Sequence, residues 1–122
     1  VDTVAALEQL VASVRAAGRM AFDTETELEP GAPPIVTPLR ADLVSIAIAL
    51  APGEAYYLPF GHRAPGGQGA FDLGEGDATD APIVRNLPPL RDPRCASLVA
   101  LFEDPAVAKV AQNAKYDVLV LR

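Results

Sequence analysis

The stretch that decides the fold is Asp42-Leu43-Val44-Ser45-Ile46-Ala47-Ile48-Ala49-Leu50, together with Ala51-Pro52-Gly53-Glu54 and Ala55-Tyr56-Tyr57-Leu58-Pro59. The first run is nearly all apolar and rich in β-branched side chains, which favours a strand buried on both faces. Pro52 and Gly53 are turn residues, and the run after them has the composition of a second strand. The stretch therefore predicts a β-hairpin, which is an antiparallel pair of strands.

The chain before the hairpin predicts a helix followed by a strand. Apolar residues recur at helical spacing over Thr3–Ala17, where Asp2 or Thr3 can cap the start and Gly18 can end the helix. In Arg19–Thr26 every second residue is apolar or β-branched, which predicts a strand of the core sheet.

The chain around and after the hairpin predicts two loops and three further elements. Leu28–Arg40 and Gly61–Asn86 are rich in proline or glycine and predict loops. Arg91–Glu103 predicts a helix, Val107–Gln112 a short strand, and Lys115–Arg122 the beginning of another helix. The element order combines a hairpin with a crossover, so the predicted fold class is α/β with a mixed sheet and flanking helices.

Composition limits the possible functions. The 122 residues are 50% apolar with a net charge of −6, which suits one domain with a modest core and no membrane partner. The negative charge argues against broad binding of duplex DNA through a basic surface, although an enzyme that handles nucleic acid through metal ions remains possible. Cys95 is the only cysteine, which excludes an internal disulfide and fits a cytoplasmic protein.

The run Phe22-Asp23-Thr24-Glu25-Thr26 is the most informative for chemistry. Side chains alternate along a strand, so Asp23 and Glu25 share one face, and burial in a core sheet would raise the cost of their repulsion. A hard divalent ion, Mg²⁺ or Mn²⁺, would offset that cost. The ordinary alternative is a strand end where both acids meet water, and it is the commoner case for an isolated Asp-x-Glu.

A second group of polar residues, Gln112-Asn113-Ala114-Lys115-Tyr116-Asp117, lies where the short strand is expected to pass into the last helix. Functional residues often occupy such junctions. The alternative explanation is structural: Asn113 caps the helix, and Asp117 is a first-turn acid stabilised by the helix dipole.

Taken together, these segments resemble the 3′→5′ proofreading exonuclease domain of bacterial DNA polymerase I, a family A polymerase. That domain is a DEDD-type exonuclease with a ribonuclease H-like fold. The two acidic runs, the hairpin and the helix end Leu101-Phe102-Glu103-Asp104-Pro105 occur in the same order. The resemblance covers nearly the whole chain except the loops 29–40 and 63–86. It implies that residues 1–122 are a partial exonuclease domain, whose third acidic motif, a Tyr followed by an Asp, would lie downstream of Arg122.

The resemblance also implies roles for individual residues. Asp23, Glu25 and Asp117 would be catalytic ligands of two Mg²⁺ or Mn²⁺ ions, with Asp23 bridging both. The ions would activate the attacking water and stabilise the leaving 3′ oxygen. The residues implied to bind the substrate are Thr24, Leu28, Asn113 and Tyr116.

The function implied is proofreading of a single-stranded 3′ DNA end, with a polymerase domain in the same chain, in the bacterial cytoplasm. Two alternatives stay open: a catalytically inactive structural or DNA-guiding domain, and a free-standing DEDD exonuclease acting on RNA or DNA. Because one acidic motif is missing, the chain alone is expected to have weak or no activity.

Overall fold

The computed structural model describes residues 1–31, 37–63 and 85–122, and their strands form a mixed sheet in the order β3-β2-β1-β4. The strands are β1 (Arg19–Leu28), β2 (Ala41–Ala51), β3 (Glu54–Pro59) and β4 (Ala108–Val110). The hairpin prediction is confirmed, because β2 pairs antiparallel with both β1 and β3, whereas β4 runs parallel to β1. The helices are α1 (Val4–Ala17), α2 (Ala96–Glu103) and α3 (Lys115–Val120), with 3-10 turns η1 (Pro38–Arg40) and η2 (Pro93–Cys95).

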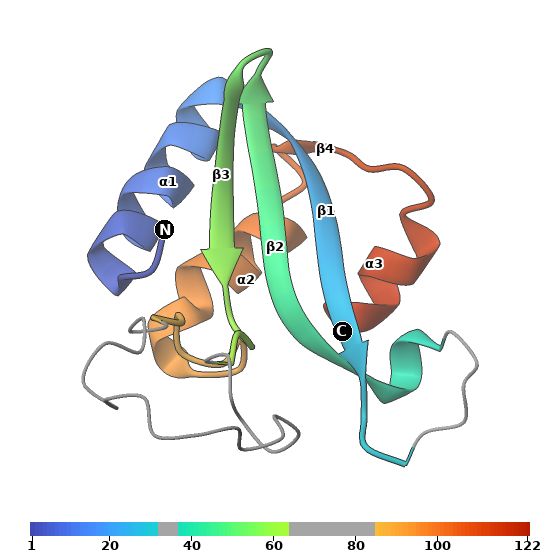
Figure 1. The fold of residues 1–122 in the computed structure, drawn as a ribbon. Helices are drawn as coiled ribbons and strands as arrows, with labels where there is room; N and C mark the ends of the chain where they lie inside the picture. The colour runs from blue at the N-terminus through green and yellow to red at the C-terminus, as the bar shows by residue number, and fades with distance from the viewer. Residues whose placement is uncertain (32–36, 64–84) are drawn as a thin grey trace.

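This mixed sheet with flanking helices confirms the predicted fold class and is compatible with a ribonuclease H-like fold. Figure 1 shows α2 crossing behind the strands and α3 next to β1, below β4 in that view. Among the described residues, no helix is long and apolar enough to cross a membrane.

Helix α1 begins and ends where the sequence predicts. The Thr3 hydroxyl accepts a hydrogen bond from the Ala6 amide at 3.2 Å, which satisfies one of the free amides at the helix start. Gly18 ends the helix with φ of 65°, a left-handed conformation that glycine adopts without strain.

One face of the sheet carries the core. Phe22 of β1 meets Phe102 of α2 edge to face, with ring centroids 5.1 Å apart, and fully buried side chains from β2 and β3 pack against α1 and α2. The buried apolar residues of the three long strands and of these two helices are Leu7, Leu10, Val11, Val14, Met20, Phe22, Ile46, Ile48, Leu58, Leu98 and Leu101.

The other face, here called the open face, corrects one prediction. β2 was expected to be buried on both sides, but Ala47 is exposed while its neighbours Ile46 and Ile48 are 0% and 1% exposed. The reason is that α1 and α2 cover only one side of the sheet. Residues paired across strands share a face, so the open face includes Asp23, Glu25, Ala47 and Tyr57.

Several element boundaries differ from the predictions. The helix expected from Arg91 starts as η2 at Pro93 and becomes α-helical only at Ala96. Proline restricts the residue before it to extended backbone, and Asp92 has φ −68° and ψ 138°. The strand expected over 107–112 and the helix expected over 115–122 are both shorter. In the two predicted loops, Leu28 belongs to β1 and residues 38–40 form η1, while 32–36 and 64–84 lie outside the described residues.

Candidate metal and nucleic-acid site

Asp23 and Glu25 lie on the open face of β1, as the alternation of side chains predicts. Asp23 pairs with Ala47 and Glu25 with Ser45, just before an irregularity in the pairing of β1 with β2. Both acids are exposed, which is the ordinary alternative for an isolated Asp-x-Glu. Water and salt screen exposed charges, so these two carboxylates do not by themselves require a cation.

Thr24 lies between the two acids and points to the opposite side of β1. Only 8% of Thr24 is exposed, and its partner is Asp117 of α3, which is 4% exposed. Oδ1 of Asp117 accepts hydrogen bonds from the Thr24 amide at 3.0 Å and from the Thr24 hydroxyl at 2.6 Å. These bonds bring the second acidic run to the strand that carries the first.

Thr26 makes a second link between the same two elements. Its hydroxyl lies 2.7 Å from the hydroxyl of Tyr116, the residue before Asp117. Helix α3 is therefore fastened to β1 by two neighbouring pairs of polar side chains, Thr24 with Asp117 and Thr26 with Tyr116.

Asn113 does not cap α3, so that prediction is wrong. The residue in the cap position is Ala114, and no side chain there accepts a hydrogen bond from the helix. Asn113 instead has a φ of 53°, and asparagine is one of the few residues that tolerate the left-handed region. Leu28 ends β1 and is 37% exposed. For Thr24, Leu28, Asn113 and Tyr116, contact with a substrate stays a prediction.

The carboxylates of Asp23, Glu25 and Asp117 suit Mg²⁺ or Mn²⁺, since carboxylate oxygens are the ligands that hard cations prefer. Within residues 1–31, 37–63 and 85–122, however, no three acidic, histidine or cysteine side chains are grouped so that they could hold a metal ion. Asp23 and Glu25 share the open face, whereas Asp117 is engaged by Thr24. The three acids are therefore the type of ligand that a hard cation prefers. However, the described structure does not bring them together around one position.

Two features near Glu25 and Asp23 had no signal in the sequence. Ser45, the cross-strand neighbour of Glu25, is 1% exposed, and its hydroxyl has no hydrogen-bond partner within the described part of the chain. Tyr57, across Ala47 from Asp23, places its hydroxyl 2.6 Å from Nε2 of His62. The contact of Tyr57 with His62 depends on how the chain turns after β3, which residue type alone does not specify.

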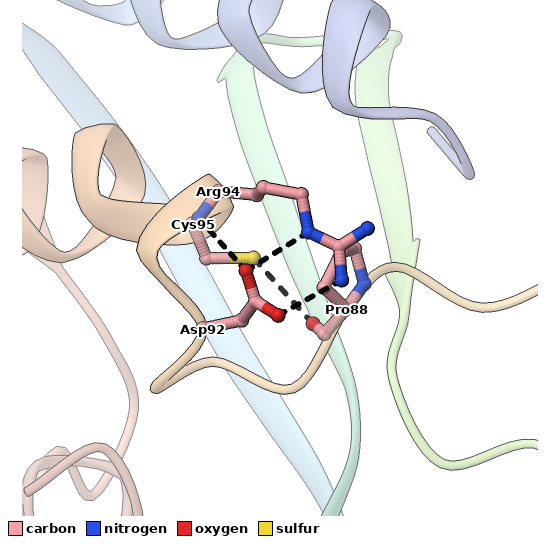
Figure 2. Close-up of polar contacts among 4 residues, drawn as sticks. All are labelled: Pro88, Asp92, Arg94 and Cys95. Carbon is pink, nitrogen blue, oxygen red and sulfur yellow. Dashed lines mark hydrogen bonds and ion pairs between the residues drawn. The ribbon is translucent and has the colours of Figure 1, made fainter.

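A further polar cluster, formed by Asp92, Arg94 and Cys95 around η2 just before α2, has a structural role. Figure 2 shows the Arg94 side chain folded back onto the Asp92 carboxylate, with bonds of 2.9 Å from Nε and 2.8 Å from Nη2. The Arg94 hydrogen bonds lower the pKa of Asp92 to about 2. The buried Cys95 thiol donates to the Pro88 carbonyl at 3.4 Å, and burial raises the pKa of this thiol.

A cavity of about 890 Å³ lies apart from the three acids. It is bordered by β2, α2 and the end of α3, and its lining includes Val44, Phe60 and Val99 but none of Asp23, Glu25 and Asp117.

Three curated proteins that are similar to this chain are named DNA polymerase I. No family model matches the chain. It is 35% identical over 127 aligned residues to DNA polymerase I of Rhizobium leguminosarum, covering 95% of this chain and 11% of that protein. It is 35% identical over 117 residues to DNA polymerase I of Chloroflexus aurantiacus, covering 95% of this chain and 9% of that protein. It is 32% identical over 102 residues to DNA polymerase I of Pseudomonas aeruginosa, covering 84% of this chain and 8% of that protein.

The chain thus spans only about a tenth of the length of these curated relatives. For the first two of them the alignment covers 95% of this chain. The chain is related in sequence to a short region of proteins named DNA polymerase I.

Proposed function

We propose that this chain is the metal-binding part of a 3′→5′ exonuclease region in a DNA polymerase I-like protein. The observation that carries the proposal is the fastening of Asp117 to β1, the strand on which Asp23 and Glu25 share an exposed face. Residues 93 positions apart are brought together there, and both acidic runs resemble those of the exonuclease family. The similarity to proteins named DNA polymerase I supports the same reading.

In this proposal the carboxylates of Asp23 and Glu25 would bind divalent cations, and Asp117 would contribute from α3, where Thr24 now holds it on the other side of β1. Two bound ions would lower the pKa of the attacking water and stabilise the leaving 3′ oxygen. Exposure of Asp23 and Glu25 on the open face leaves both carboxylates accessible to a cation, which in turn could bind a phosphate.

The proposed substrate is a single-stranded 3′ end of DNA. A chain with a net charge of −6 is poorly suited to holding DNA by a basic surface, so binding would depend on stacking and a few backbone contacts. Leu28, 37% exposed at the end of β1, can offer an apolar surface to a terminal base. Asn113 and Tyr116, which precede Asp117 in the sequence, are the other proposed substrate contacts. A polymerase part of the same chain would deliver the DNA end.

The test is hydrolysis of 3′-labelled single-stranded DNA by the full-length protein in Mg²⁺. Asp23→Ala should slow hydrolysis roughly 10²–10³-fold, since a metal ion supplies several kcal/mol of transition-state stabilisation and each 1.36 kcal/mol is tenfold. Glu27→Ala is the matched control, because Glu27 is another exposed acid of β1 and should leave the rate nearly unchanged.

Unchanged degradation by Asp23→Ala would show that the metal site is assigned wrongly. Absence of activity in the unmodified protein would favour a structural or DNA-guiding role. Faster degradation of a labelled RNA of the same sequence would favour an RNA-directed exonuclease.

A further inference from the structure

Tyr57 of β3 is the one exposed aromatic side chain among the residues that the structure describes. It is 48% exposed, whereas every other phenylalanine and tyrosine described is buried or half-buried. Exposure alone is common for tyrosine, so the surroundings of this ring decide whether it has a role.

Tyr57 lies in the same cross-strand row as Asp23. Asp23 of β1 and Tyr57 of β3 both pair with Ala47 of β2, so the three side chains share the open face. Two strand spacings of about 4.8 Å separate their backbones, and a few nucleotides stacked about 3.4 Å apart can span that distance. A shallow hollow of about 190 Å³ reaches from Asp23 to Ala55 across this face, and alanines line most of it. The row therefore leaves room for a flat group beside the Tyr57 ring.

The Tyr57 ring is held in place by contacts with the chain that follows β3. Its hydroxyl lies 2.6 Å from Nε2 of His62, and the two ring centroids are 5.6 Å apart. His62 is fixed in turn, because the Asn86 side chain accepts from its amide at 3.0 Å and donates to its carbonyl at 2.8 Å. The Leu87 amide donates to the Pro59 carbonyl at 2.7 Å, which ties this segment to the end of β3. A ring that is already ordered loses less conformational entropy when a ligand stacks on it.

The charge of the open face decides which part of a nucleic acid suits it. Asp23 and Glu25 are exposed there, and the chain carries a net charge of −6, so a bare phosphate is disfavoured. A base is uncharged and flat, and proteins commonly hold single strands by stacking bases on aromatic side chains. The base is therefore the part of a single-stranded DNA end that fits beside Tyr57.

We propose that Tyr57 is a stacking platform for a base of the single-stranded DNA end, with His62 as the residue that orients its ring. This inference rests on the proposed function and deepens it, because it adds a substrate contact on β3, away from those proposed on β1 and around α3. Stacking itself needs no metal ion, so it can be measured with divalent ions removed.

The experiment titrates the full-length protein into an oligothymidylate with 2-aminopurine at its 3′ end, in EDTA so that no metal-dependent hydrolysis occurs. The fluorescence of 2-aminopurine falls when this base stacks, so quenching reports the contact and gives its Kd. Tyr57→Ala should raise that Kd by about 5–150-fold, the range expected for the loss of one base stacked on an aromatic ring. Tyr57→Trp keeps an aromatic surface and should keep the quenching.

Two further variants test His62. Tyr57→Phe keeps the ring without its hydroxyl, and His62→Ala removes the bonding partner, so each should raise the Kd by about 2–10-fold, the cost of ordering one side chain on binding. The two changes combined should cost no more than either alone. Val110→Ala is the matched control: Val110 is 64% exposed and pairs with Ala21 on the same face, but it lies on β4 at the opposite edge of the sheet. Its Kd should not change.

Thermal unfolding of each variant checks that it folds, and Tyr57→Leu replaces Tyr57→Ala if the alanine variant does not. An absence of quenching by the unmodified protein, or an unchanged Kd in Tyr57→Ala, would overturn the stacking platform. Hydrolysis in Mg²⁺ by Asp23→Ala tests the proposed function separately. If Asp23→Ala is inactive while Tyr57→Ala binds normally, only the stacking platform fails. If Asp23→Ala is fully active while Tyr57→Ala binds weakly, the proposed function fails and the base contact stands.

Discussion

Asp92 is held by three hydrogen bonds from one neighbour. It accepts from the backbone amide of Arg94 and from two nitrogens of the Arg94 guanidinium, and these bonds lower the pKa of its carboxyl to about 2. A lowered pKa means that folding favours the charged form. The resulting stability is present above the ordinary aspartate pKa of about 4 and is lost as the pH falls toward about 2.

Asp92→Asn should therefore lower the melting temperature at pH 7, and the gap to the unmodified chain should narrow as the pH is taken from about 4 to about 2. Thermal unfolding followed by circular dichroism at pH 7, 4 and 2.5 measures this gap. Arg94→Met removes the guanidinium donors and should reproduce the same trend. A gap that is identical at all three pH values would contradict the assignment.

At the residue scale, the sequence predicted which face of a strand a side chain occupies better than it predicted what surrounds that side chain. Alternation along β1 was enough to place Asp23 and Glu25 on one face, because it is a local property of any strand. Their exposure depends on which side α1 and α2 cover, and no local pattern encodes that. The contact of Thr24 with Asp117 joins residues 93 positions apart, so only the assembled fold could reveal it.

At the scale of elements, the helix ends and turns that could be predicted are those fixed by local chemistry. The two ends of α1 could be predicted from Thr3 and Gly18, because capping hydroxyls and left-handed glycines act within one turn of the helix end. Gly53, with φ of 81°, marks the hairpin turn in the same way. The short strand β4 is different, because its length is set by pairing with β1 over three positions and not by its own side chains.

Gly61 shows how β2 and the chain after β3 approach each other. Its amide donates to the Val44 carbonyl at 3.0 Å, and a Cβ at this position would lie 2.8 Å from the Leu43 carbonyl oxygen and 3.2 Å from Val44 Cα. Backbone atoms cannot move aside as a flexible side chain can, so a methyl group here would force two segments apart.

Gly61→Ala should therefore destabilise the chain by about 1–3 kcal/mol, the usual cost of overpacking. Urea unfolding gives this difference in free energy. Gly53→Asn is the control: a Cβ there meets nothing within 4 Å, and asparagine tolerates positive φ, so its cost should be smaller. A Gly61→Ala chain as stable as the unmodified one would mean that the two segments do not approach this closely.

At the scale of the whole molecule, the described residues form a sheet with one covered face and one open face. The covered face holds the large apolar side chains that stabilise the fold. The open face holds small residues such as Ala47 beside Asp23 and the half-exposed Tyr57. The apolar core and the exposed acids Asp23 and Glu25 thus lie on opposite sides of the same strands, so changes on one side should be separable from changes on the other.

Neighbouring residues of β2 test this division. Ile46 is 0% exposed on the covered face, so Ile46→Ala should cost about 2–5 kcal/mol through lost burial and a cavity. Ala47 is exposed on the open face, so Ala47→Thr should be neutral or stabilise by up to about 1 kcal/mol, since β-branched residues favour strands. Urea unfolding of the 122-residue chain at two protein concentrations measures both effects and detects self-association. A loss of about 1–3 kcal/mol in Ala47→Thr would indicate overpacking, and the open face would then be covered by a second layer.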